Sequence, residues 1–137
     1  MNWTLEVVAV PVSDVDRAKA FYAEKLGFDL DHDRRISEEF RVVQLTPPGS
    51  RCSVVLGRGV VDMTPGSLKG LQLVVNEIRA ARARLVERGA EVGEVQVIGA
   101  SGPRPARDGE DLDNVGFVFF SDPDGNGWAV QQISARD

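Results

Sequence analysis

The sequence has very few of the residues that build disulfides and zinc centres. Of its 137 residues, one is cysteine and one is histidine. With Cys52 alone, no disulfide can form within the chain, and zinc sites made of several cysteines are excluded. A chain without disulfides suits a reducing compartment, so we expect this protein in the cytoplasm.

Positive charge and long apolar runs are also scarce. The chain has 16 lysines and arginines against 21 acidic residues, a formal net charge of -5. Nucleic acids and anionic membrane surfaces favour basic partners, so we expect neither. No apolar run approaches the roughly 20 residues that span a bilayer, and the opening MNWTLE lacks the basic and apolar segments of a signal peptide. The 42% hydrophobic content instead indicates a globular domain with a real core.

A repeated pattern organises the chain into two halves. The segment 12–15 (VSDV) resembles 75–78 (VNEI), and each segment precedes an alanine-rich helical pattern. Ser13 is the expected N-cap of the first helix, and Asn76 and Glu77 cap the second. Strands are predicted at 5–12, 28–36, 40–46 and 51–56, and again at 71–75, 91–98, 116–120 and 128–133. The polar segment 100–114 is expected to be a long loop.

Each half therefore reads as a βαβββ unit. One such unit alone would leave a face of its sheet uncovered, so we expect two to pack together. This predicts one domain over 1–137, with a first module at about 1–60 and a second at about 68–137.

Three motifs occur in the same order in a known superfamily. They are VPVSDVDRA at 10–18 followed by Phe21 and Tyr22, LGF at 26–28, and DPDGN at 122–126. With the repeat, the chain resembles the vicinal oxygen chelate superfamily, which includes glyoxalase I, bleomycin-resistance proteins and extradiol dioxygenases. The resemblance implies an α+β fold in which two βαβββ modules form curled mixed sheets around a concave cavity. It also implies a homodimer.

Metalloenzymes of that superfamily hold a divalent ion with four inward-facing residues, usually His, Glu or Gln. Counted from the motifs, the corresponding positions here are Val7, Ser53, Gly70 and Ala129. A shift of two residues, which keeps a side chain on the same face, places Gln72 and Gln131 there instead. These side chains are poor ligands for a divalent ion. We therefore expect no metal and no other cofactor.

Strand alternation suggests which residues face the cavity. Together with the family positions, the candidate ligand-binding residues are Val7, Gln44, Ser53, Gln72, Phe117, Phe119, Ala129 and Gln131. Their neighbours Val118, Phe120, Trp128 and Val130 should form the core. Aromatic and amide groups suit a neutral, planar or partly apolar organic ligand. Alternatively, these side chains simply fill a closed cavity.

The function predicted from the resemblance is metal-free binding of a small organic molecule such as an antibiotic, as in bleomycin-resistance proteins. The alternative is a metal-dependent lyase, epimerase or dioxygenase that acts on a substrate with vicinal oxygens. That alternative requires residues such as Glu6, Gln72 and Gln131 to converge on an ion. A metal-free enzyme stays open as well, although no catalytic residue is identifiable.

Other motifs have simpler interpretations. The segment 122–127 (DPDGNG) begins like a calcium-binding loop, but Ile133 stands where the final acid is needed, so a tight turn is favoured. His32 lies among charged residues and is expected to be solvated. Arg104 and Arg107 in the 100–114 loop could receive an anionic ligand or remain in solvent.

Overall fold

The computed structural model describes residues 1–135. The contacts divide the chain into two compact units. The first contains Met1–Leu68 together with Asp122–Asn126, and the second contains Lys69–Ser121 and the chain from Gly127 onward. The organisation of 1–137 as one domain, with modules at about 1–60 and 68–137, stays a prediction.

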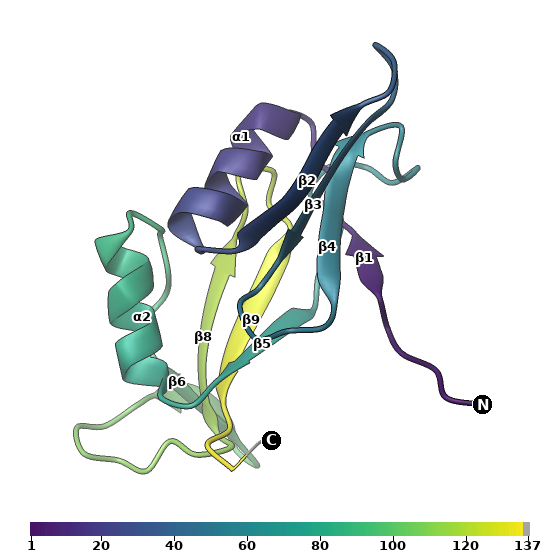
Figure 1. Ribbon diagram of the computed structural model, residues 1–137. Coiled ribbons are helices and arrows are strands. Elements are labelled where there is room, and N and C mark those ends of the chain that lie inside the picture. Colours follow the sequence, from purple (N-terminus) through teal and green to yellow (C-terminus); the bar gives the residue numbers. More distant parts are fainter. Residues whose placement is uncertain (136–137) are drawn as a thin grey trace. The chain divides into compact units, whose positions relative to one another are not determined.

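The first unit is built on a four-stranded mixed sheet in the order β1-β4-β3-β2. Strand β1 runs parallel to β4, and the other neighbours are antiparallel. The helix α1 contacts β4 and continues directly into one π-helical segment, η1 (Figure 1). The elements are β1 (Val7–Ala9), α1 (Val15–Ala20), η1 (Phe21–Lys25), β2 (Asp29–Arg35), β3 (Arg41–Thr46) and β4 (Ser53–Arg58).

The start of α1 differs from the prediction by one residue. Asp14, and not Ser13, is the N-cap: its carboxylate accepts a hydrogen bond from the Arg17 backbone N–H at 3.0 Å. The Ser13 hydroxyl donates instead to Asp124 Oδ1 at 2.5 Å. The Ser13 side chain, which the local sequence pattern predicted to cap the helix, therefore binds Asp124, a residue far away in sequence. At the other end, Gly27 follows the helix with φ of +76°, as expected for a terminating glycine.

The second unit has a five-stranded sheet in the order β5-β9-β8-β6-β7. Strand β5 is parallel to β9, and the helix α2 contacts β8 and β9. Glu77 caps α2 by accepting from the Ala80 N–H at 2.7 Å, as predicted. The elements are β5 (Leu71–Val75), α2 (Ile78–Glu87), β6 (Gln96–Gly99), β7 (Gly102–Pro105), β8 (Gly116–Ser121) and β9 (Gly127–Gln132).

Two predictions for this unit were wrong. The strand expected over 91–98 begins only at Gln96, and the expected loop 100–114 contains the strand β7, paired antiparallel with β6. The β7 sequence, Gly-Pro-Arg-Pro, is unfavourable in a central strand because proline donates no backbone hydrogen bond. It is tolerated because β7 has a partner on one side only.

One face of each sheet is packed and the other is open. In β3, Val43 and Leu45 are fully buried, while Val42 and Gln44, which alternate with them, are half-exposed. In the second unit the predicted core residues Val118, Phe120, Trp128 and Val130 are all buried, which confirms them. The α+β fold with two βαβββ modules is likewise confirmed, with β7 as an addition. None of the helices in residues 1–135 is long and apolar enough to cross a membrane.

Candidate functional site

We call the side of each sheet opposite its buried core the open face. On the first sheet, the register pairs Val7 with Ser53 and Gln44 with both Val55 and His32. Paired residues project from the same side of a sheet. The predicted residues Val7, Gln44 and Ser53 therefore share the open face of the first sheet. Val7 is 40% exposed, whereas Ser53 is buried.

A chain of hydroxyl groups crosses this face. Thr46 Oγ1 lies 2.5 Å from Asp31 Oδ2 and 2.6 Å from Ser53 Oγ. An ionised carboxylate can only accept, so Thr46 donates to Asp31 and Ser53 donates to Thr46. Asp31 and Thr46 were not among the predicted site residues. The register is irregular between Leu30 and His32, which simple alternation along the strand does not reveal.

The open face of the second sheet is aromatic and amide-bearing. The register places Gln72, Ala129 and Phe119 in one row across β5, β9 and β8. Val74, Gln131 and Phe117 form the adjacent row. All five predicted residues of the second half therefore share one face.

Two interactions order the side chains on this face. The rings of Phe117 and Phe119 are stacked, with centroids 6.1 Å apart and planes within 6° of parallel. Gln72 Nε2 donates to Gln131 Oε1 at 2.5 Å, and Gln131 Nε2 donates to the Asn114 carbonyl at 2.8 Å. The face thus presents an apolar ring surface next to oriented amide groups, a combination suited to an organic molecule.

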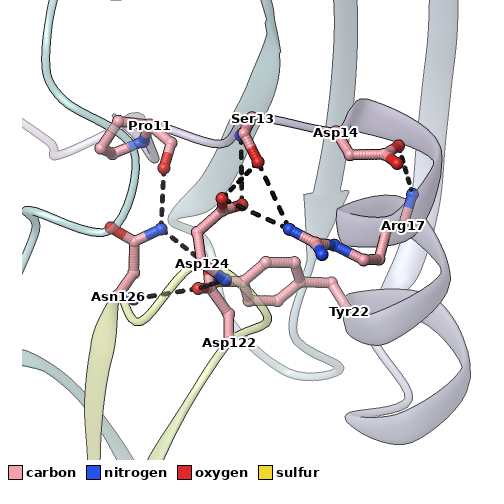
Figure 2. Close-up of polar contacts among 8 residues, drawn as sticks. All are labelled: Pro11, Ser13, Asp14, Arg17, Tyr22, Asp122, Asp124 and Asn126. Atoms are coloured by element: carbon pink, nitrogen blue, oxygen red, sulfur yellow. Dashed lines mark hydrogen bonds and ion pairs between the residues drawn. The ribbon is translucent and has the colours of Figure 1, made fainter.

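The 122–126 turn belongs to the first unit. Figure 2 shows its side chains bonded to residues before α1, on α1 and on η1. Asp122 Oδ2 accepts from the Tyr22 hydroxyl at 2.7 Å and from Asn126 Nδ2 at 2.8 Å. The same Asn126 nitrogen donates to the Pro11 carbonyl at 2.8 Å. The Asp124 carboxylate accepts from Ser13. These acids are engaged by protein donors, consistent with the tight turn predicted in place of a calcium loop.

The first unit also contains an ion-pair cluster between α1 and the sheet. Arg41 donates to both carboxylate oxygens of Asp33, at 3.0 and 2.8 Å, and Lys19 donates to Asp33 at 2.9 Å. Hydrogen bonds from Arg41 and then Lys19 hold the pKa of Asp33 well below its usual value of 3.8. The same contact raises the pKa of Arg41. Because the members of this cluster are paired with one another, we expect the removal of one of them to destabilise the first unit.

The predicted anion receptors of the 100–114 segment lie in the second unit. Arg104 donates to both Glu110 oxygens, one of them at 3.0 Å, and lowers the pKa of Glu110 to about 2. The Arg107 backbone N–H donates to the same carboxylate at 2.9 Å. Arg104 therefore already has an internal counterion and is a poor anchor for an anionic ligand.

Comparison with known proteins identifies the family. Residues 4–130 match the Glyoxalase/Bleomycin resistance protein/Dioxygenase superfamily. The chain belongs to this superfamily. No curated protein sequence gives a significant match.

Several solved structures of the superfamily resemble this chain. TnmS3, an antibiotic binding protein from Streptomyces sp. CB03234, is 35% identical, with a TM-score of 0.73 over 97% of this chain and 98% of its own. A glyoxalase/bleomycin resistance protein from the same organism is 36% identical, with a TM-score of 0.70 over 94% and 100%. A superfamily member from Sphaerobacter thermophilus DSM 20745 is 27% identical, with a TM-score of 0.73 over 96% and 98%.

The residues present do not fit the divalent ion of the superfamily's metalloenzymes. Val7, Gly70 and Ala129 have no side-chain donor atom, and the Ser53 hydroxyl is engaged by Thr46. Within residues 1–135, no group of three or more His, Cys, Asp or Glu side chains could hold a metal ion. Neutral hydroxyl and amide groups alone are weak ligands for such an ion.

Proposed function

We propose that this chain is a metal-free small-molecule-binding protein of the bleomycin-resistance type. Its ligand is an organic compound such as an antibiotic. The observation that carries the proposal is the open face of the second sheet, where the stacked Phe117 and Phe119 rings lie beside the Gln72–Gln131 amide pair. The open face of the first sheet, with Val7, Gln44 and Ser53, supplies a second candidate surface.

The chemistry of these faces supports binding over metal-assisted catalysis. Aromatic rings remove apolar ligand surface from water, and amides fix its orientation. The metal-dependent alternative requires strong ligands at the family positions, where valine, serine, glycine and alanine stand. Glu6, the acid closest to those positions on the strand predicted at 5–12, is exposed and precedes the observed β1. The similarity to an antibiotic binding protein, at 35% identity, also supports ligand binding.

Metal analysis and a ligand screen test the proposal together. The chain is purified without chelator or metal-affinity resin, and its metal content is measured by inductively coupled plasma mass spectrometry. We expect far less than one equivalent per chain, and a rise in melting temperature with at least one compound from a panel of antibiotics and planar aromatic molecules. About one equivalent of zinc, nickel, iron or manganese would favour the metalloenzyme instead.

We also infer a homodimer that works in the cytoplasm. Members of the superfamily are commonly dimers. The single cysteine, Cys52, forms no disulfide within the chain and suits a reducing compartment. Size-exclusion chromatography with light scattering should give twice the mass of the chain at micromolar concentration. A mass equal to one chain would contradict the dimer.

A further inference from the structure

The amide pair on the second sheet has a fixed direction. A carbonyl oxygen can only accept a hydrogen bond, so the Asn114 carbonyl requires the nitrogen of the Gln131 amide to face it. The Gln131 oxygen is then turned toward Gln72 and accepts from Gln72 Nε2. The orientation of both side chains therefore follows from one backbone carbonyl, and not from an arbitrary choice between oxygen and nitrogen.

Gln72 has amide hydrogen-bonding groups that the chain to Gln131 does not use. Its amide has two N–H donors and one oxygen acceptor, and the chain to Gln131 uses one N–H. Among the described residues, no hydrogen-bond partner is found for the second N–H or for Oε1. Gln72 is exposed. It therefore offers one donor and one acceptor from the same planar amide.

The neighbours of Gln72 define the rest of the surface. Ala129 separates Gln72 from Phe119 in their row, and Gln72 and Phe119 are two strands apart, or about 10 Å. Alanine projects only a methyl group, so it places little bulk between the Gln72 amide and the Phe119 ring. Phe119 is 40% exposed, which leaves its ring available for edge or face contact with another aromatic ring.

We propose that this face binds a planar aromatic molecule whose edge carries an adjacent hydrogen-bond donor and acceptor, as in a fused-ring lactam. The ring lies over Ala129 against Phe119, and the N–H and C=O of the lactam pair with Oε1 and Nε2 of Gln72. Gln131 is a positioning residue, because it orients Gln72 without touching the ligand. This inference rests on the proposed function and narrows it to one ligand class.

Three matched probes separate the contributions of the aromatic rings, the carbonyl and the N–H to binding. 2-Quinolinone has the aromatic rings and the complete lactam edge. N-Methyl-2-quinolinone keeps the carbonyl but lacks the N–H, and naphthalene lacks both groups. Each is titrated into the full chain, and dissociation constants are measured from amide chemical-shift changes in NMR spectra. We expect 2-quinolinone to bind about tenfold more tightly than its N-methyl derivative, because the latter leaves an amide group of Gln72 unpaired.

Two variants assign the effect to residues. Gln72→Leu should weaken 2-quinolinone about tenfold. It should leave the N-methyl compound within about twofold, because the methyl group already keeps the edge of that compound from pairing with Gln72, so the two compounds become equivalent. Gln131→Met removes the hydrogen bond that orients Gln72 but keeps Gln72 itself. It should therefore reduce only partly the difference in affinity between 2-quinolinone and its N-methyl derivative. Gln96→Leu is the matched control: Gln96 lies on the same sheet, beyond Phe117 and outside the amide chain, and should preserve the full difference. Thermal melts confirm that each variant is folded.

The outcomes distinguish this inference from the proposed function. Equal affinity for the two quinolinones, or equal weakening of both by Gln72→Leu, overturns the lactam assignment. Absence of binding by all three probes, while another member of the wider panel binds, also overturns it and leaves the proposed function standing. If no compound of the panel binds either, both are overturned.

Discussion

The two units share a βαβββ plan but differ in the polar groups that they bury. The interior of the first unit includes polar groups: Asn126 is fully buried, and Asp122 and Arg41 are nearly so. The packed face of the second sheet is apolar, with Phe120 stacked on Trp128 at a centroid distance of 6.0 Å. The same backbone pattern therefore accommodates buried hydrogen-bonded groups beside the apolar core in one copy, and an aromatic, apolar core in the other.

The open faces of the two sheets also carry different chemical groups. The first sheet presents a hydroxyl chain that ends on the exposed Asp31, and the second presents stacked rings and an amide pair. The hydroxyl chain of the first sheet has its members bonded to one another, whereas Gln72 in the second retains one unused donor and one unused acceptor. This difference is why we place the ligand contact on the second sheet. The following substitutions would break or sharpen the comparison.

The largest effect is expected in the apolar core of the second unit. Phe120→Ala should lower the free energy of unfolding by about 4 kcal/mol, because it leaves a cavity against Trp128. Phe119→Ala, one residue away on the open face, should cost about 1 kcal/mol since that ring is already partly hydrated. Urea denaturation followed by circular dichroism measures both. Similar losses for the two variants would mean that the packed and open faces of β8 do not differ as described.

Asn126→Ala tests the polar interior of the first unit. Asn126 donates to Pro11 and Asp122 and accepts from the Leu68 N–H at 3.1 Å. Removing its amide leaves buried groups unpaired, so we expect a loss of about 3 kcal/mol by the same urea method. Asn76→Ala, at an exposed asparagine, should change stability by less than about 0.5 kcal/mol. A small loss at Asn126 would show that the turn network is not required.

Asp33→Asn tests the ion-pair cluster through its pH dependence. The pKa of Asp33 is lowered by Arg41 and Lys19, so its contribution is complete above the unfolded value of 3.8 and declines as pH falls below that value. We expect the variant to be about 2 kcal/mol less stable at pH 7. The difference should begin to shrink below about pH 3.8 and shrink further at lower pH, because the carboxyl takes up a proton in the unfolded chain before it does so in the folded one. Asp29→Asn is the exposed control, and a pH-independent difference at Asp33 would contradict the assignment.

Thr46→Val gives the smallest expected change. Valine keeps the shape of threonine but removes the hydroxyl that links Asp31 and Ser53. Asp31 is exposed and regains water, whereas the buried Ser53 hydroxyl loses its partner, so we expect a loss of about 1 kcal/mol. Thr4→Val near the exposed N-terminus is the comparison. If Thr46→Val is neutral in chemical denaturation, the hydroxyl chain does not contribute to stability.

Much of this fold could be predicted from local patterns. Alternating hydrophobicity located the core residues Val118, Phe120, Trp128 and Val130, because a strand turns successive side chains to opposite faces. The same alternation grouped Gln72, Phe117, Phe119 and Gln131 on one face, and the family resemblance added Ala129. Helix signals located α2 and its cap at Glu77. The motifs located the superfamily.

The sequence by itself therefore determined the βαβββ repeat and which side chains share a face, since both follow from short-range periodicity, and its motifs implied the fold through the family resemblance. Tertiary structure alone decided the partners. The Ser13 hydroxyl donates a hydrogen bond to Asp124, so Asp14 caps the helix instead. The proline-rich segment Gly102–Pro105 forms an edge strand. Hydrogen bonds connect Asp31, Thr46 and Ser53 in one chain. Hydrogen bonds between residues far apart in sequence depend on register and bulges, which no local pattern encodes.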